Sequence, residues 1–414
     1  MTINNKNKNP NVPPLRFPEF SGEWEMVSLQ DIATINPKSD SLQNTFIYID
    51  LEAVEKGELR KIQEIMREEA PSRAQRVIDN NDILFQCVRP YQKNNYIHKT
   101  QNTSNQQWVA STGYAQIRTT ESPNYIYHLL NTDGFNRKVM VRCTGSSYPA
   151  INSEDLATIR FYFTIDKKEQ LKISRLLDLL DERIATQNKI IEDLKKLKSA
   201  IIERLFCSPK DKQPKVRLHG FSDDWHFVRL SDICHRIRRK NIGEQCKQVL
   251  TIAAQYGLVS QEEFFNKIVA SENLSGYYLL QKGDFAYNKS YSGDYVWGTA
   301  KRLDNYEQGV LSPLYICFRP DSAKVDSDFL AYYFESKKWH KTVADIAGEG
   351  ARNHGLLNIS VIDYFNTIHC IPSMDEQKQI AQIVSTLLSK IAREQRVLNC
   401  YAAQRQYLLR QMFI

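Results

Sequence analysis

Apolar residues recur at alternating steps of three and four along two stretches of the chain, residues 173–205 and 380–412. A heptad pattern of this length is typical of a coiled coil. A helix with a single apolar stripe has to bury that stripe against a partner. We therefore expect the two helices to pair with each other, antiparallel. Their expected seam consists of Ile173, Leu177, Leu180, Ile184, Ile191, Leu194, Ile380, Val384, Leu387, Ile391, Leu398 and Leu408.

Polar residues interrupt the two seams at equivalent steps, Gln187 with Glu394 and Lys198 with Arg405. Buried polar seam residues fix the register and the partner of a coiled coil, at some loss of stability. Alternatively, long polar side chains extend to solvent from an imperfect seam. The pattern alone leaves both interpretations open.

The remaining chain is rich in β-branched and aromatic residues bounded by turn residues, which predicts strands. One helix is expected inside each strand-rich region, after Pro123 and after Asp326, because apolar residues there recur at helical spacing. The expected strands are residues 46–54, 76–88, 114–119, 157–165, 248–254, 283–289, 314–320 and 365–371.

The two halves of the chain repeat each other. FSGEWEMVSLQDI at Phe20 returns as FSDDWHFVRLSDI at Phe221, an offset of 201 residues. Further matches follow in the same order, and the offset has drifted to 207 at the Glu-Gln pair of each seam helix, beginning at Glu169 and Glu376. A drift of this kind is what loop insertions produce, and the period is far too long for a solenoid repeat. The sequence thus predicts a duplicated domain pair.

The expected fold is α+β, with two duplicated strand-rich domains separated by two long helices that form an antiparallel coiled coil with pseudo-twofold symmetry. The expected limits are a polar N-terminal segment 1–14, a first domain 15–166, a first helix 167–207, a linker 208–214, a second domain 215–372 and a second helix 373–414.

Composition excludes fewer classes of function than the repeat does. The chain has 414 residues, 42% hydrophobic residues and a net charge of +7, which permits an anionic partner without requiring one. No apolar run is long enough to span a membrane. Eight cysteines lack a CxxC pair, which favours a reducing cytoplasm and no metal site; Cys234, His235 and Cys246 do not have the spacing of one. There is no phosphate-binding G-x-x-x-x-G-K-[ST] motif, so ATP hydrolysis is not expected.

The RFPEFSGEW and VRLHGFSDDW entrances and the helices that begin KKEQLKISRLLDLLDERI and DEQKQIAQIVSTLLSKI resemble the specificity subunit of type I restriction-modification systems. The resemblance covers nearly the whole chain. It implies a non-catalytic, DNA-binding protein in which each domain reads one half of an asymmetric, bipartite site. The helices would set the spacer and dock two modification subunits that methylate adenine with S-adenosylmethionine. Restriction subunits would supply ATP- and Mg²⁺-dependent cleavage, and this chain would need no cofactor of its own.

Candidate DNA contacts lie in four polar loops, residues 87–96, 144–152, 287–295 and 348–358, that occupy corresponding places in the two halves. Arginine can read guanine with two hydrogen bonds, and lysine suits phosphate. Each residue could equally belong to an ordinary solvated loop. The candidates are Arg89, Tyr91, Lys93, Ser146, Ser147, Tyr148, Lys289, Ser290, Tyr291, Arg352, Asn353 and His354. Trp24 and Trp225 are instead expected in the domain cores.

Two other function classes remain open. Duplicated domains on a stiff spacer could grip protein rather than DNA, as a binding scaffold. A self-contained DNA methyltransferase or nuclease is the other alternative, but the sequence has no Asp/Asn-Pro-Pro-aromatic motif of adenine methyltransferases and no carboxylate or nucleophile paired with His354 at a catalytic spacing.

Overall fold

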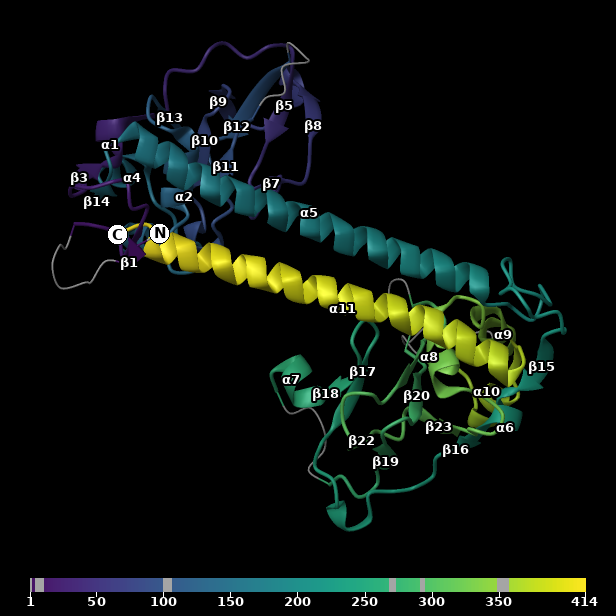
Figure 1. The fold of residues 1–414 in the computed structure, drawn as a ribbon. Coiled ribbons are helices and arrows are strands. Elements are labelled where there is room, and N and C mark those ends of the chain that lie inside the picture. Colours follow the sequence, from purple (N-terminus) through teal and green to yellow (C-terminus); the bar gives the residue numbers. More distant parts are fainter. Residues whose placement is uncertain (1, 4–10, 100–105, 268–272, 291–294, 348–356) are drawn as a thin grey trace. The chain divides into compact units, whose positions relative to one another are not determined.

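The computed structural model describes residues 2–3, 11–99, 106–267, 273–290, 295–347 and 357–414 (Figure 1). The chain forms two compact units. The first unit comprises residues 1–189 with 396–414, and the second comprises residues 190–395. Within the described residues, no helix is long and apolar enough to cross a membrane.

The first unit contains two four-stranded sheets and several short helices. One sheet has the strand order β11-β10-β13-β4 and is antiparallel; the other has the order β8-β5-β12-β9, with β12 and β5 parallel. Its elements before the first long helix are β1 Thr2–Ile3, β2 Leu15–Arg16, β3 Glu25–Ser28, α1 Leu29–Ile32, β4 Ala33–Ile35, β5 Thr45–Ile49, β6 Val54–Glu55, β7 Glu58–Leu59, β8 Gln63–Met66, the 3-10 helix η1 Arg67–Glu69, β9 Ala74–Ile78, β10 Ile83–Gln86, the 3-10 helix η2 Pro90–Gln92, β11 Tyr96–Ile97, β12 Gln107–Ser111, β13 Tyr114–Thr119, α2 Pro123–Leu130, α3 Asp133–Arg142, α4 Ser153–Ala157 and β14 Arg160–Phe163.

The second unit repeats the plan. Its four-stranded sheet has the order β16-β23-β20-β21, which corresponds strand by strand to β4-β13-β10-β11 of the first unit. Strands occur within each expected range, but two ranges are divided by turns: residues 46–54 contain most of β5 and the start of β6, and residues 76–88 contain the end of β9 and all of β10. The elements of the second unit before the second long helix are β15 His226–Arg229, α6 Leu230–Ile233, β16 Cys234–Arg236, the 3-10 helix η3 Ile242–Glu244, β17 Leu250–Ala253, β18 Gly257–Ser260, α7 Gln261–Phe265, β19 Tyr278–Gln281, β20 Phe285–Asn288, β21 Thr299–Arg302, β22 Gln308–Leu311, β23 Ile316–Pro320, α8 Ser327–Glu335, α9 His340–Ile346, α10 Val361–Phe365 and β24 Ile368–Ile371.

The helices expected inside each domain are α2 and α8, and both begin at a side-chain cap. Ser122 accepts a hydrogen bond from the backbone N–H of Tyr125, and Asp326 accepts one from Phe329. Such caps satisfy backbone donors that would otherwise lack a partner at a helix start. The apolar face of each helix then packs into the core of its own unit, as the helical spacing predicted.

Two long helices, α5 Lys167–Leu205 and α11 Met374–Gln411, each contribute to both units. In the first unit, the beginning of α5 shares a core with the end of α11. In the second unit, the end of α5 shares a core with the beginning of α11. Both pairings are antiparallel, which confirms the predicted fold class. The residues that the helices bury in these cores are Ile173, Leu177, Leu180, Leu408, Leu409 and Met412 in the first unit and Ile202, Leu205, Ile380, Ala381 and Val384 in the second.

The other predicted seam residues lie at less buried positions. Ile191 is buried, whereas Leu194, Leu387, Ile391 and Leu398 are half-buried. Ile184 packs at the margin of the first core. Outside the two domain cores, the predicted seam residues are therefore mostly half-buried, with Ile191 as the exception.

The polar interruptions of the seam behave in two different ways. Arg405 of α11 forms a two-pronged ion pair with Asp181 of α5, with its Nη2 at 3.2 Å from Asp181 Oδ2. This pair lies across the two helices and supports a role in fixing their register. Lys198 instead reaches Glu335 at the end of α8, at 2.9 Å.

The entrance motif of each half is locked to its long helix by a buried ion pair. Arg16 donates from Nε and Nη2 to the two carboxylate oxygens of Glu169, at 2.7 and 2.9 Å. Arg217 and Glu376 repeat this arrangement at 3.3 and 3.1 Å. Each arginine also donates to a backbone carbonyl of its own entrance turn. The Glu of the repeated Glu-Gln pair therefore has a structural role.

The Gln of the same Glu-Gln pair positions the helix inside each domain, α2 or α8. Gln170 accepts a hydrogen bond from the backbone N–H of Ser122, the cap of α2, at 3.1 Å. Gln377 accepts the corresponding bond from Asp326, the cap of α8, at 2.8 Å. Each long helix is thereby fixed to the domain that precedes it, through side chains that the sequence repeat contains twice.

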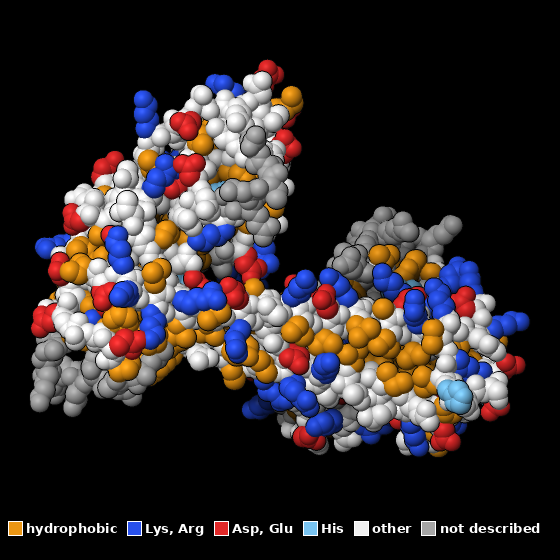
Figure 2. Space-filling view, turned by 45° about the horizontal axis from the view of Figure 1, so that its top comes forward, with side chains coloured by type: hydrophobic (Ala, Val, Ile, Leu, Met, Phe, Trp, Pro, Cys, Tyr) orange, Lys and Arg blue, Asp and Glu red, His pale blue; other side chains and the backbone are white. Residues whose placement is uncertain are grey.

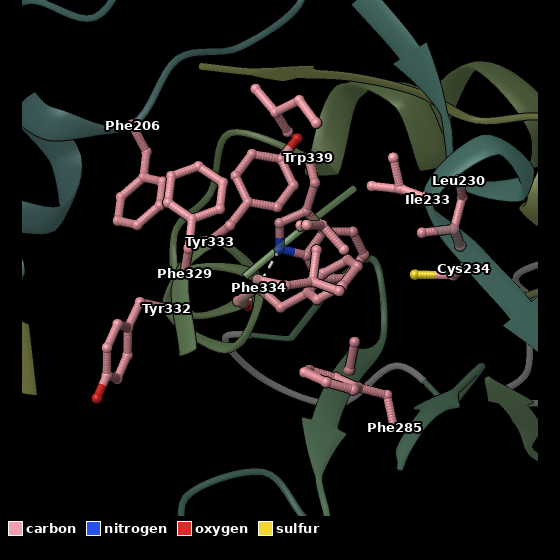
Figure 3. Close-up of a cluster of buried hydrophobic side chains, with 14 of the residues drawn as sticks. Phe206, Leu230, Ile233, Cys234, Phe285, Phe329, Tyr332, Tyr333, Phe334 and Trp339 are labelled. Atoms are coloured by element: carbon pink, nitrogen blue, oxygen red, sulfur yellow. Dashed lines mark hydrogen bonds between the residues drawn. The ribbon is translucent and has the colours of Figure 1, made fainter. Parts of the chain in front are cut away.

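Aromatic side chains fill the core of the second unit. Figure 3 shows Phe206 beside Phe329 and Tyr333, with ring centroids 5.1 and 6.0 Å from Phe206. The Trp339 indole donates to the backbone carbonyl of Phe334, drawn as the dashed line. The two entrance tryptophans, Trp24 and Trp225, are buried as expected.

Candidate nucleic-acid interface

The two candidate loops of the first unit lie side by side. Val88 and Ala150 form a β-bridge. The backbone N–H of Arg89 donates to the carbonyl of Pro149 at 2.8 Å, and that of Ile151 donates to Cys87 at 3.1 Å. We call residues 87–95 the first reading loop and residues 144–150 the second reading loop. Backbone hydrogen bonds join the two loops into a single surface.

Arg89 and Tyr148 meet across this surface. The guanidinium carbon lies 4.4 Å from the centre of the tyrosine ring. Stacking of this kind orients a guanidinium while leaving its N–H donors free for a partner. The Tyr148 side chain is 62% exposed, and Ser146 and Ser147 are exposed beside it. The geometry therefore presents one cation and two hydroxyl groups to solvent.

The second reading loop needs glycine at its turn. Gly145 has φ +89°, and a Cβ built there would lie 2.9 Å from the carbonyl oxygen of Tyr148. Thr144 and Ala150 pair through both backbone hydrogen bonds, at 2.9 Å each. The turn that carries Ser146, Ser147 and Tyr148 is thus a tight hairpin closed at its base.

The first reading loop has a strained backbone. Arg89 and Lys93 flank η2 and both have left-handed backbone angles, with φ of 55° and 53°. Each such residue costs about 1–2 kcal/mol when it is not glycine. Strain of this kind is concentrated at functional sites, where surrounding contacts hold it in place.

The other two candidates of this loop differ in surroundings. Tyr91 is 51% exposed. Lys93 is engaged within the protein, because its Nζ donates to Asp133 Oδ1 at 2.7 Å and to the carbonyl of Asn131 at 3.2 Å. The hydrogen bond from Lys93, together with the guanidinium of Arg410, holds the pKa of Asp133 below its ordinary value.

The corresponding loops of the second unit are described only in part. The backbone N–H of Leu357 donates to the carbonyl of Lys289 at 2.9 Å, as Ile151 does to Cys87. Lys289 and Ser290 are half-buried at this position. The predicted contacts Tyr291, Arg352, Asn353 and His354 lie outside the described residues.

Buried acid–arginine pairs support the central strands of both units, and the sequence analysis missed them. Asp82 accepts from Arg118 at 2.7 and 2.8 Å, and Asp284 accepts from Arg319 at 2.5 Å. Burial raises the pKa of Asp284, although a backbone N–H and Arg319 oppose the shift. These pairs recur at offsets of 202 and 201, so the repeat was a signal that could have found them.

A run of cations in the second unit was also missed. Arg236 ends β16, an edge strand, and Arg238 follows it; both are exposed and form no ion pair within the described part of the chain. Arg239 pairs with Asp284, and Lys240 lies 3.8 Å from the centre of the Tyr278 ring. The RIRRK sequence was the signal for this basic segment.

Charge alone does not locate an interface. Figure 2 shows Lys and Arg side chains spread over the visible face, with Asp and Glu among them. The reading loops are distinguished instead by their paired backbone geometry and by the stacking of Arg89 on Tyr148. Among the described residues, no group of three or more His, Cys, Asp or Glu side chains could hold a metal ion.

Comparisons with known proteins agree with this architecture. A family model described as the type I restriction modification DNA specificity domain matches residues 21–196 and, a second time, residues 222–399. A comparison with curated protein sequences found no match.

Solved structures share the fold at low sequence identity. The S subunit of a type I restriction-modification system from M. genitalium is 14% identical, with a TM-score of 0.55 over 97% of this chain and 99% of its own. A chain from a structure described as the "structural basis underlying complex assembly and conformational transition of the type I R-M system" is 18% identical, with a TM-score of 0.55 over 93% of this chain and 96% of its own. The resemblance inferred from the sequence is thereby confirmed. Because the family model matches both halves and most of the chain, this protein belongs to the type I restriction modification DNA specificity domain family.

Proposed function

We propose that this chain is the DNA-reading, non-catalytic subunit of a type I restriction-modification complex in the cytoplasm. Each unit reads one half of an asymmetric, bipartite site in double-stranded DNA. The paired long helices set the spacer and dock modification subunits. S-adenosylmethionine, ATP and Mg²⁺ act in the modification and restriction subunits, and this chain holds no cofactor.

One observation carries the proposal. In each unit, the residue that follows the equivalent strand, β10 or β20, accepts the same backbone hydrogen bond, from Ile151 in the first unit and from Leu357 in the second, yet the side chains there differ. Where the first unit has Cys87, the second has Lys289. Equivalent scaffolds with unlike loops are suited to reading two unlike sequences, because loops carry specificity while strands position them.

The proposed first half-site contacts are Arg89, Tyr91, Ser146, Ser147 and Tyr148; Lys93, the remaining candidate from the sequence, is engaged by Asp133 and Asn131. Arg89 is the strongest candidate for a base, because an arginine fork matches guanine O6 and N7. Its stacking on Tyr148 orients the fork in advance. The proposed contacts of the second half-site are Lys289, Ser290, Tyr291, Arg352, Asn353 and His354.

The test compares Arg89→Ala with Arg89→Lys, which keeps the charge but loses the fork. The complex with modification subunits is titrated with duplexes that carry every single-base substitution of its preferred site. Both variants should lose about 1–3 kcal/mol of discrimination at one position of one half-site. Unchanged discrimination in both variants would remove Arg89 from the interface. Binding of modification subunits without any binding of DNA would favour the protein-scaffold alternative.

A further inference from the structure

Buried side-chain amides hold the first reading loop from beneath. Gln86, the last residue of β10, donates from its backbone N–H to Asn95 Oδ1 at 2.8 Å and from Nε2 to Gln92 Oε1 at 3.0 Å. Its own Oε1 accepts from the backbone N–H of Asn94 at 3.1 Å. Gln86 and Asn95 are only 3% and 2% exposed. Gln86 thus holds the second half of the loop, and neither Gln86 nor Asn95 is accessible to a DNA base.

The same network continues into the connection between α2 and α3. Asn95 Nδ2 donates to Asn131 Oδ1 at 3.1 Å, and Asn131 Nδ2 donates to the carbonyl of Tyr127 at 2.8 Å. Fully satisfied amide networks in a low-dielectric interior rigidify the backbone around them. We call Gln86, Asn95, Asn131 and Asn136 the amide clamp.

The start of α3 supplies the last contacts of the loop. Asn136 Nδ2 donates to the carbonyl of Pro90, the first residue of η2, at 3.1 Å. Lys93 ends η2 and is held by Asp133 and by the carbonyl of Asn131. Asp133 also accepts from Arg410 of α11, at 3.1 Å. Arg89, before η2, is therefore held by the second reading loop. Lys93, after η2, is held by residues at the start of α3 and just before it.

We propose that the amide clamp and Lys93 are positioning residues, which set the base preference of the first half-site without contacting DNA. The inference rests on the proposed function. Two left-handed residues in five make the loop dependent on external contacts, and the clamp provides such contacts at Pro90, Gln92 and Asn94. Lys93 acts here as an anchor, so its role differs from the phosphate contact that its residue type suggested.

The clamp contacts are not repeated among the described residues of the second unit, where Asn288 instead accepts from the backbone N–H of Ser290 at 2.9 Å. The positions equivalent to Gln86, Asn131 and Asn136 hold Asn288, Glu335 and His340 in the second unit. There, the Tyr287 hydroxyl donates to the carbonyl of Trp297 at 2.8 Å, and Tyr287 stacks on Tyr364. The contacts at these positions thus differ between the two units, and damage to the clamp should leave the second half-site unaffected.

The test uses the complex of the full chain with modification subunits and a pool of duplexes randomised across both half-sites. The variants are Asn136→Ala and the nearly isosteric Asn136→Leu, with His340→Ala as the matched control in the second unit. Loss of one neutral hydrogen bond predicts a fall of about 2–10-fold in discrimination within the first motif. The second motif should remain as in the parent protein, and the unfolding midpoint should fall no further than the loss of one hydrogen bond allows.

Lys93→Met separates the two roles of the lysine. If Lys93 only positions the loop, Lys93→Met should alter the base preference in the first motif and leave the slope of log affinity against log salt concentration unchanged. A phosphate contact predicts the reverse, with a slope smaller by about 0.9 and an unchanged motif, and would overturn this role of Lys93. An unchanged first motif in both Asn136 variants would overturn the clamp. If the complex formed with the unsubstituted chain selects no sequence motif from the pool, the proposed function itself would be overturned.

Discussion

The buried pair of Arg16 and Glu169 allows a sharp test of how the entrance motif holds the first unit together. The substitution is Arg16→Met, which keeps much of the side-chain length and removes the charge. Glu169 is 0% exposed, and it would retain the Thr164 hydroxyl as its hydrogen-bond donor, at 2.7 Å. A carboxylate left in this position would be buried without its counter-charge.

Removing one partner of a buried ion pair typically costs about 3–5 kcal/mol. We expect Arg16→Met to fall in that range, because Arg16 is only 7% exposed and donates to both carboxylate oxygens. Arg217→Met in the second unit is the matched comparison. Its arginine is 18% exposed and its contacts with Glu376 are longer, so we expect about half the loss.

The assay is denaturant unfolding of the full chain, combined with hydrogen exchange of β3 and β14, the strands beside the entrance motif. Arg16→Met should lower protection in these strands and leave the equivalent pair β15 and β24 protected. The double variant with Glu169→Met should recover part of the loss, because it leaves no buried charge. A change of less than about 0.5 kcal/mol in Arg16→Met would refute the reasoning, since that is the range of ordinary surface substitutions.

The spacing role of the helices predicts that one added heptad in each of α5 and α11, at the limits between the two units, lengthens the preferred gap between half-sites by about 3 base pairs, since seven residues add roughly 10 Å. Site selection with the extended protein measures the gap, and an unchanged gap would remove the ruler role. A separate prediction concerns His369, which burial keeps neutral by lowering its pKa to about 3. Because the unfolded state takes up a proton below about pH 6.5 and the folded state does not, this histidine should reduce stability by up to about 1.4 kcal/mol per pH unit as pH falls from 6.5 towards 3. His369→Gln should flatten that part of the pH–stability curve, and an equally steep curve would contradict the assignment.

The pattern of neighbouring residues predicted the long helices and the strands. The seam residues Ile173 and Ile380 and the strands β10 and β20 follow from the spacing of apolar side chains. The repeated entrance motif predicted two like units. Roles inside that motif could also have been read from the repeat, because Arg16 with Glu169 and Arg217 with Glu376 occur at matching places in the two halves.

The interface was harder to predict, because its geometry joins residues far apart in the chain. The sequence located the loop of Arg89 and the loop of Tyr148, but nothing local indicates that a bridge between Val88 and Ala150 brings them together. The amide clamp left no signal at all. Gln86 lies in an expected strand and Asn95 in a polar loop, and only their burial reveals that the two amides meet.

The central claim is that one chain carries two unlike DNA readers held at a fixed separation. The most direct test is to let the complex with its modification subunits select duplexes from a fully randomised pool and to sequence the bound fraction. The account predicts two short, unlike motifs separated by a constant number of unspecified base pairs. A single continuous motif, a palindrome, or two motifs at variable separation would contradict it.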